Sequence, residues 1–116
     1  MNKRQLGKEK EQMAANYLQN KGYEILCCNY QCRQAEIDII AKKEEYLVFI
    51  EVKYRKNKKY GGSIYAVPPR KQQKICYAAR NYIFEHQIPL NQAMRFDVVA
   101  MDGNEILHIK NAFDAY

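Results

Sequence analysis

The stretch AEIDIIAKKEEYLVFIEVKY, residues 35–54, decides the fold. Its two halves, AEIDIIA and YLVFIEVKY, both place alternate residues on opposite faces, and a two-residue period is typical of a β-strand. If the hairpin loop is KEEY, residues 43–46, then Lys42 pairs with Leu47. The stretch therefore predicts an antiparallel β-hairpin at the centre of the protein.

This register gathers charged side chains on one face of the hairpin. It sets Asp38 opposite Glu51 and Glu36 opposite Lys53. Like charges directly opposite on neighbouring strands are destabilising unless a positive charge lies between them. The arrangement therefore predicts a divalent cation at the Asp38 and Glu51 carboxylates.

Length and composition favour a small protein that associates with polyanions. The chain has 116 residues, of which 47% are hydrophobic, and this length suits one domain, residues 1–116. The net charge of +6 favours nucleic acid or an anionic membrane surface as a partner. No apolar run is long enough to cross a membrane, and the charged N-terminus has no signal-peptide pattern. We therefore expect a cytoplasmic protein without a membrane partner.

The remaining patterns predict two helices and three further strands around the hairpin. Apolar residues at spacings of three and four predict the helices, and alternation or β-branched and aromatic enrichment predicts the strands. The expected order is a helix over residues 4–21, a strand over 23–30, a turn at 31–34, the hairpin, a helix over 70–85, and a second hairpin formed by 92–101 and 105–109 with Asp102-Gly103 as its turn. This α-β-β-β-α-β-β order predicts an α/β fold with a mixed central sheet flanked by helices.

Three polar residues in these elements have ordinary structural interpretations when each element is considered alone. Glu11 borders the apolar stripe of the first helix and suits a solvated position. Gln72 continues the buried stripe of the second helix by one turn. Asp97 could bind a metal, but pairing with Arg95, two residues away on the same face, accounts for it as a structural residue.

Two basic segments are candidates for contacts with nucleic acid. Residues 55–62 break the periodicity and mix cations with tyrosines, a combination that suits phosphates and unstacked bases. The first turn of the second helix is also rich in cations, which can bind phosphate beside the free amides of a helix start. Both segments also suit an ordinary solvated surface. The candidate residues are Arg55, Lys58, Lys59, Tyr60, Arg70, Lys71 and Lys74.

The hairpin also has the side chains that phosphodiester hydrolysis requires. Magnesium prefers oxygen ligands and is commonly held by one or two carboxylates together with water and substrate phosphate. Asp38 and Glu51 provide the carboxylates, and the carbonyl of Val52 can add a further ligand. Lys53 lies two residues after Glu51 on the same face, where it can orient a water or stabilise negative charge on phosphate. These residues predict a site for Mg²⁺ or Mn²⁺.

With these motifs the chain resembles the PD-(D/E)xK, restriction-endonuclease-like superfamily, and within it the UPF0102 (YraN-like) family. The segments that carry the resemblance are KEKEQMAANYLQNKGYEIL, CCNYQCRQAEIDIIA, YLVFIEVKYR, KQQK, MRFDVVA and HIKNAF. The resemblance implies a fold similar to Holliday junction resolvases. It also implies that Asp38 and Glu51 are the metal ligands and that Glu11, Lys53 and Gln72 complete the catalytic set.

Two functional hypotheses follow from the sequence. The first is a metal-dependent nuclease that cleaves DNA, including branched or recombination DNA. The second is a non-catalytic nucleic-acid-binding module that keeps the nuclease-like fold. Opposed acids beside a lysine favour the first, because a module that only binds DNA has no need of them. The resemblance further implies a two-fold homodimer, for which the apolar residues after Ile106 offer an edge.

Overall fold

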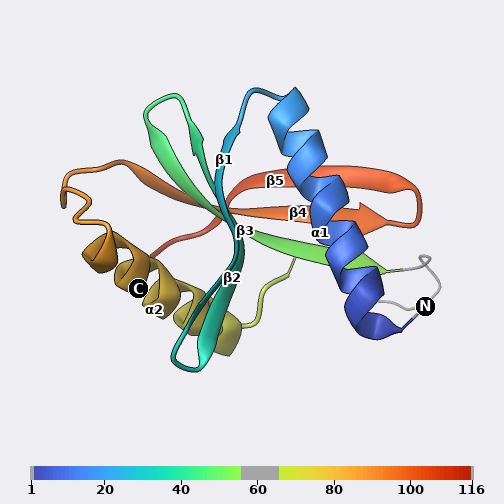
Figure 1. Ribbon diagram of the computed structural model, residues 1–116, viewed down its shortest axis with the longest axis horizontal. Coiled ribbons are helices and arrows are strands. Elements are labelled where there is room, and N and C mark those ends of the chain that lie inside the picture. Colours follow the sequence, from blue (N-terminus) through green and yellow to red (C-terminus); the bar gives the residue numbers. More distant parts are fainter. Residues whose placement is uncertain (1, 56–65, 116) are drawn as a thin grey trace.

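The computed structural model describes residues 2–55 and 66–115, which form two helices and five strands. Their order is the predicted α-β-β-β-α-β-β (Figure 1). None of the helices in these two ranges has the length and apolar character needed to cross a membrane. The elements are α1 (Lys3–Asn20), β1 (Glu24–Cys32), β2 (Ala35–Lys43), β3 (Tyr46–Arg55), α2 (Pro69–Glu85), β4 (Met94–Asp102) and β5 (Glu105–Phe113).

The five strands form one mixed sheet in the order β1-β2-β3-β4-β5. Three neighbouring pairs are antiparallel, and only β3 and β4 run parallel. Parallel neighbours need a crossover connection, and α2 lies on this crossover. The mixed sheet predicted from the sequence is therefore confirmed.

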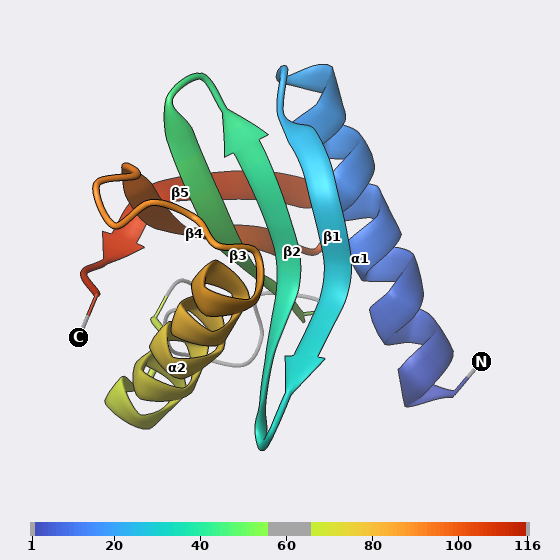
Figure 2. The same ribbon diagram turned by 60° about the vertical axis from the view of Figure 1, so that its left-hand side comes forward.

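The two helices lie on opposite faces of the sheet (Figure 2). On the α1 face, Ala14 and Leu18 pack with Ile50 and Val99 of the central strands. On the α2 face, Ile75 and other helix residues pack in one cluster with Leu47 and Phe49 of β3. Both faces of the central strands are therefore buried, which leaves their ends as the places where polar side chains can gather.

From Ile39 to Lys43 the central hairpin has the predicted register, but its loop is shorter. The pairing ends at Ile39 and Ile50, so the predicted pairs Asp38/Glu51 and Glu36/Lys53 are not part of the ladder. Lys42 pairs with Leu47 as expected. Lys43 and Tyr46, which we expected in the loop, also pair with each other, so the loop contains only Glu44 and Glu45. Glu44 has a φ of 54°. Two-residue loops with positive φ match the twist of the flanking strands, and this favours the tighter turn over the four-residue loop.

Several other predicted boundaries needed correction. The β1–β2 turn is also shorter than expected, because Cys32 pairs with Ala35 and leaves only residues 33 and 34 in the turn. Asp102 pairs with Glu105, so the last turn lies one residue later than predicted. These pairings lengthen the strands, since each turn now closes on two residues. Strand β4 starts two residues later than predicted, and β5 continues four residues beyond its predicted end.

The end of α1 follows the prediction closely. We expected the helix to end at residue 21, and the next residue, Gly22, has a φ of 90°. Its N–H donates to the carbonyl of Gln19, and the N–H of Tyr23 donates to the carbonyl of Leu18. This is the Schellman pattern, which favours glycine because the left-handed conformation strains other residues. The turn directs the chain into β1.

Candidate active site

The candidate site lies where β2 and β3 separate beyond their last paired residues, Ile39 and Ile50. Ile37 packs in the α2-face cluster and Ile39 in the α1-face cluster, so the alternation of β2 is interrupted at Asp38. The Asp38 carboxylate then takes the place of a backbone acceptor: its Oδ2 accepts a hydrogen bond of 2.8 Å from the N–H of Val52. This bond fixes Asp38 beside the strand that carries Glu51.

The carboxyl groups of Asp38 and Glu51 lie close enough for each to act on the pKa of the other. Burial, followed by the charge of Asp38, raises the pKa of Glu51 to about 8. Burial also raises the pKa of Asp38, although the Val52 N–H and the Glu51 carboxyl group act against it. The neutral form of Glu51 is therefore favoured beside Asp38, which relieves the repulsion predicted from the sequence.

Two lysines lie near this pair. The Nζ of Lys71 on α2 is 3.8 Å from Oε1 of Glu51, and the ammonium of Lys53 donates a short hydrogen bond to the carbonyl of Ala66. Both charges favour ionisation of Glu51 and so lower its pKa, although less than burial raises it. The structure thus brings Lys53 close to the acids and adds Lys71, which the sequence had placed only among the nucleic-acid contacts.

Glu11 reaches the same site from the opposite face of the sheet. Its carboxyl group lies close enough to Asp38 and to the side chain of Asn29 on β1 for both to act on its pKa. Burial and the charge of Asp38 raise the pKa of Glu11. A cavity of about 190 Å³ opens beside Glu11 and Asn29. The sequence gave no signal for Asn29, because only the packing of α1 against β1 brings its amide to the acids.

Gln72 and Arg55 are engaged in contacts within the fold. The side-chain amide of Gln72 donates a hydrogen bond of 2.8 Å to the carbonyl of Val67, just before α2. Arg55 forms a bidentate ion pair with the buried Asp102, with N···O distances of 2.7 and 2.9 Å. These contacts give both residues a structural role, and their predicted roles in catalysis and DNA binding stay predictions.

The other predicted nucleic-acid contacts fall into two groups. Arg70 and Lys74 are exposed at the start of α2 and line cavities beside the site. Lys58, Lys59 and Tyr60 lie outside the residues that the structure describes.

Asp97 has the structural role expected from the sequence. Its carboxylate forms a bidentate ion pair with Arg95, at 2.9 and 3.1 Å. His108 and the N–H of Asn111 also contact it, at 2.7 and 2.9 Å. Burial alone would raise the pKa of Asp97, but these hydrogen bonds outweigh it and lower the pKa. The sequence did not indicate the contact with His108, which comes from β5.

The donor set at the site suits a hard cation that keeps some of its own water. Across residues 2–55 and 66–115, no three His, Cys, Asp or Glu side chains are grouped closely enough to hold a metal ion by themselves. Two carboxylates, however, are the usual protein contribution to a magnesium site completed by water and phosphate. A cation between Asp38 and Glu51 would offset the repulsion that helps to raise the pKa of Glu51. The residues present therefore fit the predicted Mg²⁺ or Mn²⁺.

Comparison with known proteins identifies the family. Residues 10–101 match the model of a family described as "Uncharacterised protein family UPF0102". The chain belongs to the UPF0102 family. The matched segment contains all five residues predicted to be catalytic, Glu11, Asp38, Glu51, Lys53 and Gln72.

UPF0102 relatives match over nearly the whole chain. A UPF0102 protein of Lachnoclostridium phytofermentans is 50% identical over 116 residues, which cover 100% of this chain and 98% of the relative. A UPF0102 protein of Legionella pneumophila is 44% identical over 111 residues, 94% of each chain. Another from a Sulfurihydrogenibium species is 41% identical over 113 residues, 97% of each chain. The family assignment therefore extends over both helices and the whole sheet.

Proposed function

We propose that this UPF0102 protein is a metal-dependent nuclease that cleaves phosphodiester bonds in DNA, with branched or recombination DNA among its substrates. The observation that carries the proposal is the close pair of acids Asp38 and Glu51, in which the Val52 N–H fixes Asp38 beside the strand that carries Glu51. Repulsion between two such acids destabilises the folded protein unless a positive charge offsets it, and a bound divalent cation supplies that charge. The resemblance to PD-(D/E)xK nucleases supports the same reaction.

Each residue of the site has a role in this proposal. Asp38 and Glu51 would hold Mg²⁺ or Mn²⁺, and the carbonyl of Val52 is a third candidate ligand. The bound ion would polarise the phosphate and lower the pKa of a water molecule. Lys53 supplies positive charge toward the phosphate, and Lys71 does so from α2. Glu11, which lies close to Asp38, would accept a proton or orient a water.

The test is a cleavage assay with single-stranded, duplex and four-way-junction DNA, in Mg²⁺, Mn²⁺ or a chelator. Wild type is compared with Glu51→Gln, which keeps the size of the side chain but cannot become an anion. The matched control is Glu24→Gln, a substitution at an exposed glutamate of β1. We expect metal-dependent cutting by wild type and by the control, and loss of cutting by at least a hundredfold in Glu51→Gln.

An alternative is the non-catalytic module that binds nucleic acid with the same basic surface. It predicts that wild type and Glu51→Gln bind DNA equally and that neither cuts any of the substrates with either metal. That result would contradict the nuclease proposal. The close pair of half-buried acids favours the nuclease, because a binding surface for polyanions gains nothing from carboxylates at its centre.

A further inference from the structure

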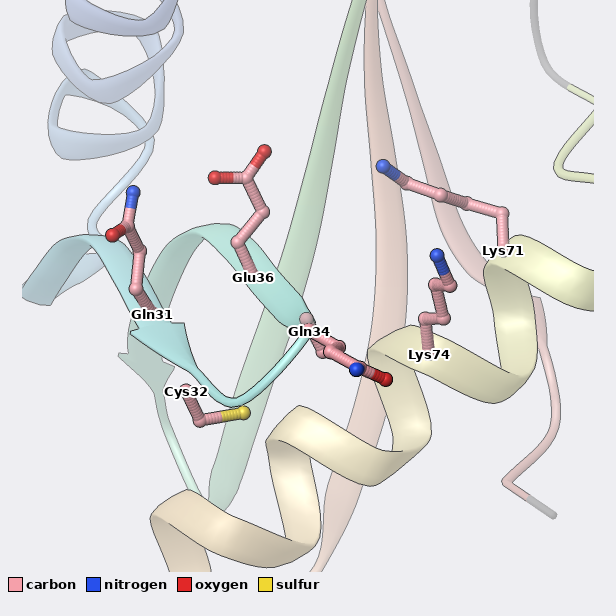
Figure 3. Close-up of a pocket in the computed structure, with 7 residues that line it drawn as sticks. Gln31, Cys32, Gln34, Glu36, Lys71 and Lys74 are labelled. Atoms are coloured by element: carbon pink, nitrogen blue, oxygen red, sulfur yellow. The ribbon is translucent and has the colours of Figure 1, made fainter.

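Two adjoining cavities extend from the candidate site along α2. The first, of about 300 Å³, lies between the strands and α2, and its lining includes Glu36, Lys71 and Lys74. Figure 3 shows the two lysines reaching from the helix toward the strands that carry Glu36 and Gln31. The second, of about 510 Å³, shares Lys74 and the turn residue Gln34 with the first. We call the two together the hairpin–α2 groove.

The hairpin–α2 groove becomes more positive away from the candidate site. Its near cavity is lined by one carboxylate, Glu36, and by two ammonium groups, Lys71 and Lys74. Of the described residues that line the far cavity, three are cations and none is a carboxylate. These cations are Arg33, Arg70 and Lys74. A phosphate is therefore attracted more strongly in the far cavity, so a bound DNA strand would run from the candidate site toward Arg33.

An aromatic ring lies among these cations. Tyr77 lines the far cavity and is 42% exposed. The amide side chain of Gln73 lines the same cavity, where it can donate to or accept from a base edge. An aromatic plane beside a cationic track is the arrangement that binds single-stranded nucleic acid, because an unpaired base can stack on the ring. Bases inside a duplex are already stacked and offer no free face.

We propose that the hairpin–α2 groove binds an unpaired strand of the DNA substrate, with Tyr77 as the surface on which a base stacks. Arg33 and Arg70 contact phosphates on that strand, and Lys74 lies between them and the acids. The volume of each cavity is compatible with a bound nucleotide. Both volumes fall in the range of ~300–1,000 Å³ that is typical of pockets for small ligands, and a nucleotide belongs to this size class. The assignment of DNA as the ligand rests on the proposed nuclease function.

The experiment measures binding separately from cleavage. Fluorescence anisotropy in chelating buffer gives the Kd of the full chain for a labelled single strand and for the matching blunt duplex. The variants are Tyr77→Ala and Tyr77→Phe. The matched control is Phe84→Ala, because Phe84 is 84% exposed about two turns further along α2 and lines a different cavity. Circular dichroism checks that each variant is folded.

We expect Tyr77→Ala to raise the Kd for the single strand about tenfold, which corresponds to ~1.4 kcal/mol. Tyr77→Phe should bind within about twofold of wild type because it keeps the ring, and Phe84→Ala should bind like wild type. The duplex should lose about twofold or less with Tyr77→Ala. A second pair of variants tests the cations: Arg33→Ala should weaken single-strand binding more than Lys42→Ala, at an exposed lysine of β2 outside the groove.

Equal Kd values for Tyr77→Ala and wild type on the single strand, or equal losses on single strand and duplex, would overturn the groove assignment. Either result leaves the nuclease proposal standing if wild type cuts DNA with metal. Conversely, single-strand binding that depends on Tyr77 in a protein that does not cut supports the groove and contradicts the nuclease. The two proposals can therefore fail independently.

Discussion

Asp38 and Glu51 lie on adjacent antiparallel strands with their carboxyl groups close enough to act on each other's pKa, and the Val52 N–H donates a hydrogen bond of 2.8 Å to Asp38. The half-buried pair lies between side chains that come from both faces of the sheet. Glu11 approaches from α1 and Lys71 from α2. The arrangement places acidic groups close together at one end of the sheet, and their repulsion affects the stability of the folded protein.

The first prediction concerns pH and stability in a buffer with chelator. The pKa of Glu51 is raised from 4.5 to about 8 in the folded protein, so the native state binds more protons than the unfolded chain between these values. The free energy of unfolding should therefore fall as pH rises from about 5 to about 8, by at most ~1.4 kcal/mol per pH unit from this group. Urea denaturation at a series of pH values measures it.

Glu51→Gln should flatten this pH dependence because glutamine stays neutral. At pH 8 the variant should be at least as stable as wild type. Glu24→Gln, at an exposed position, should keep the wild-type slope. A slope that survives unchanged in Glu51→Gln would show that another group causes it.

The second prediction concerns the buried Asp97. Asp97→Ala should lower the free energy of unfolding by ~3–5 kcal/mol, because it leaves the partly buried charge of Arg95 without its carboxylate. Chemical denaturation measures the loss. Asp114→Ala, at an exposed aspartate near the end of the chain, should change stability by less than ~0.5 kcal/mol. Equal effects of the two substitutions would contradict the structural role of Asp97.

The third prediction separates the two possible roles of Arg55. Its bidentate ion pair with Asp102 indicates that Arg55→Ala should cost ~1.5–3 kcal/mol in the free energy of unfolding. DNA affinity of the folded variant should change by about twofold or less, since the guanidinium is already engaged. Denaturation and anisotropy on the same preparation measure both quantities. If Arg55→Ala lost much of its DNA affinity while its stability stayed unchanged, Arg55 would be a phosphate contact and not a structural residue.

The fourth prediction concerns the salt dependence of DNA binding. Each lysine that contacts a phosphate adds about 0.7–0.9 to the slope of log Kd against log salt. Lys74→Ala should therefore reduce the slope by about that amount, with little change in stability, because Lys74 is exposed and lines the groove. Lys42→Ala is the matched control on β2. If both substitutions change the slope equally, binding follows net charge and not the groove.

Local sequence patterns were sufficient for the elements and for the pairing at the centre of the fold. Alternation in β2 and β3 placed Lys42 opposite Leu47, because a one-residue slip would expose the buried face of the hairpin. The helix bounds came within one residue, since Gly22 and the prolines before α2 act through their own backbone dihedral angles. The turns were placed less well. The two-residue loop of the central hairpin contains Glu44, which has a positive φ. Glutamate rarely adopts this conformation, so the residue type did not indicate the turn.

The sequence by itself therefore determined the family, the order of the elements and the register of the central hairpin, because these depend on neighbours in the chain or in the hairpin. Only the tertiary structure decided which distant groups lie beside Asp38 and Glu51. Glu11 and Lys71 meet the acids because α1 and α2 cover opposite faces of the sheet. The same packing turned Arg55 toward Asp102 and brought His108 to Asp97. Such contacts join segments that are far apart in the chain, and the helix and strand periodicities of the sequence do not indicate which distant segments meet.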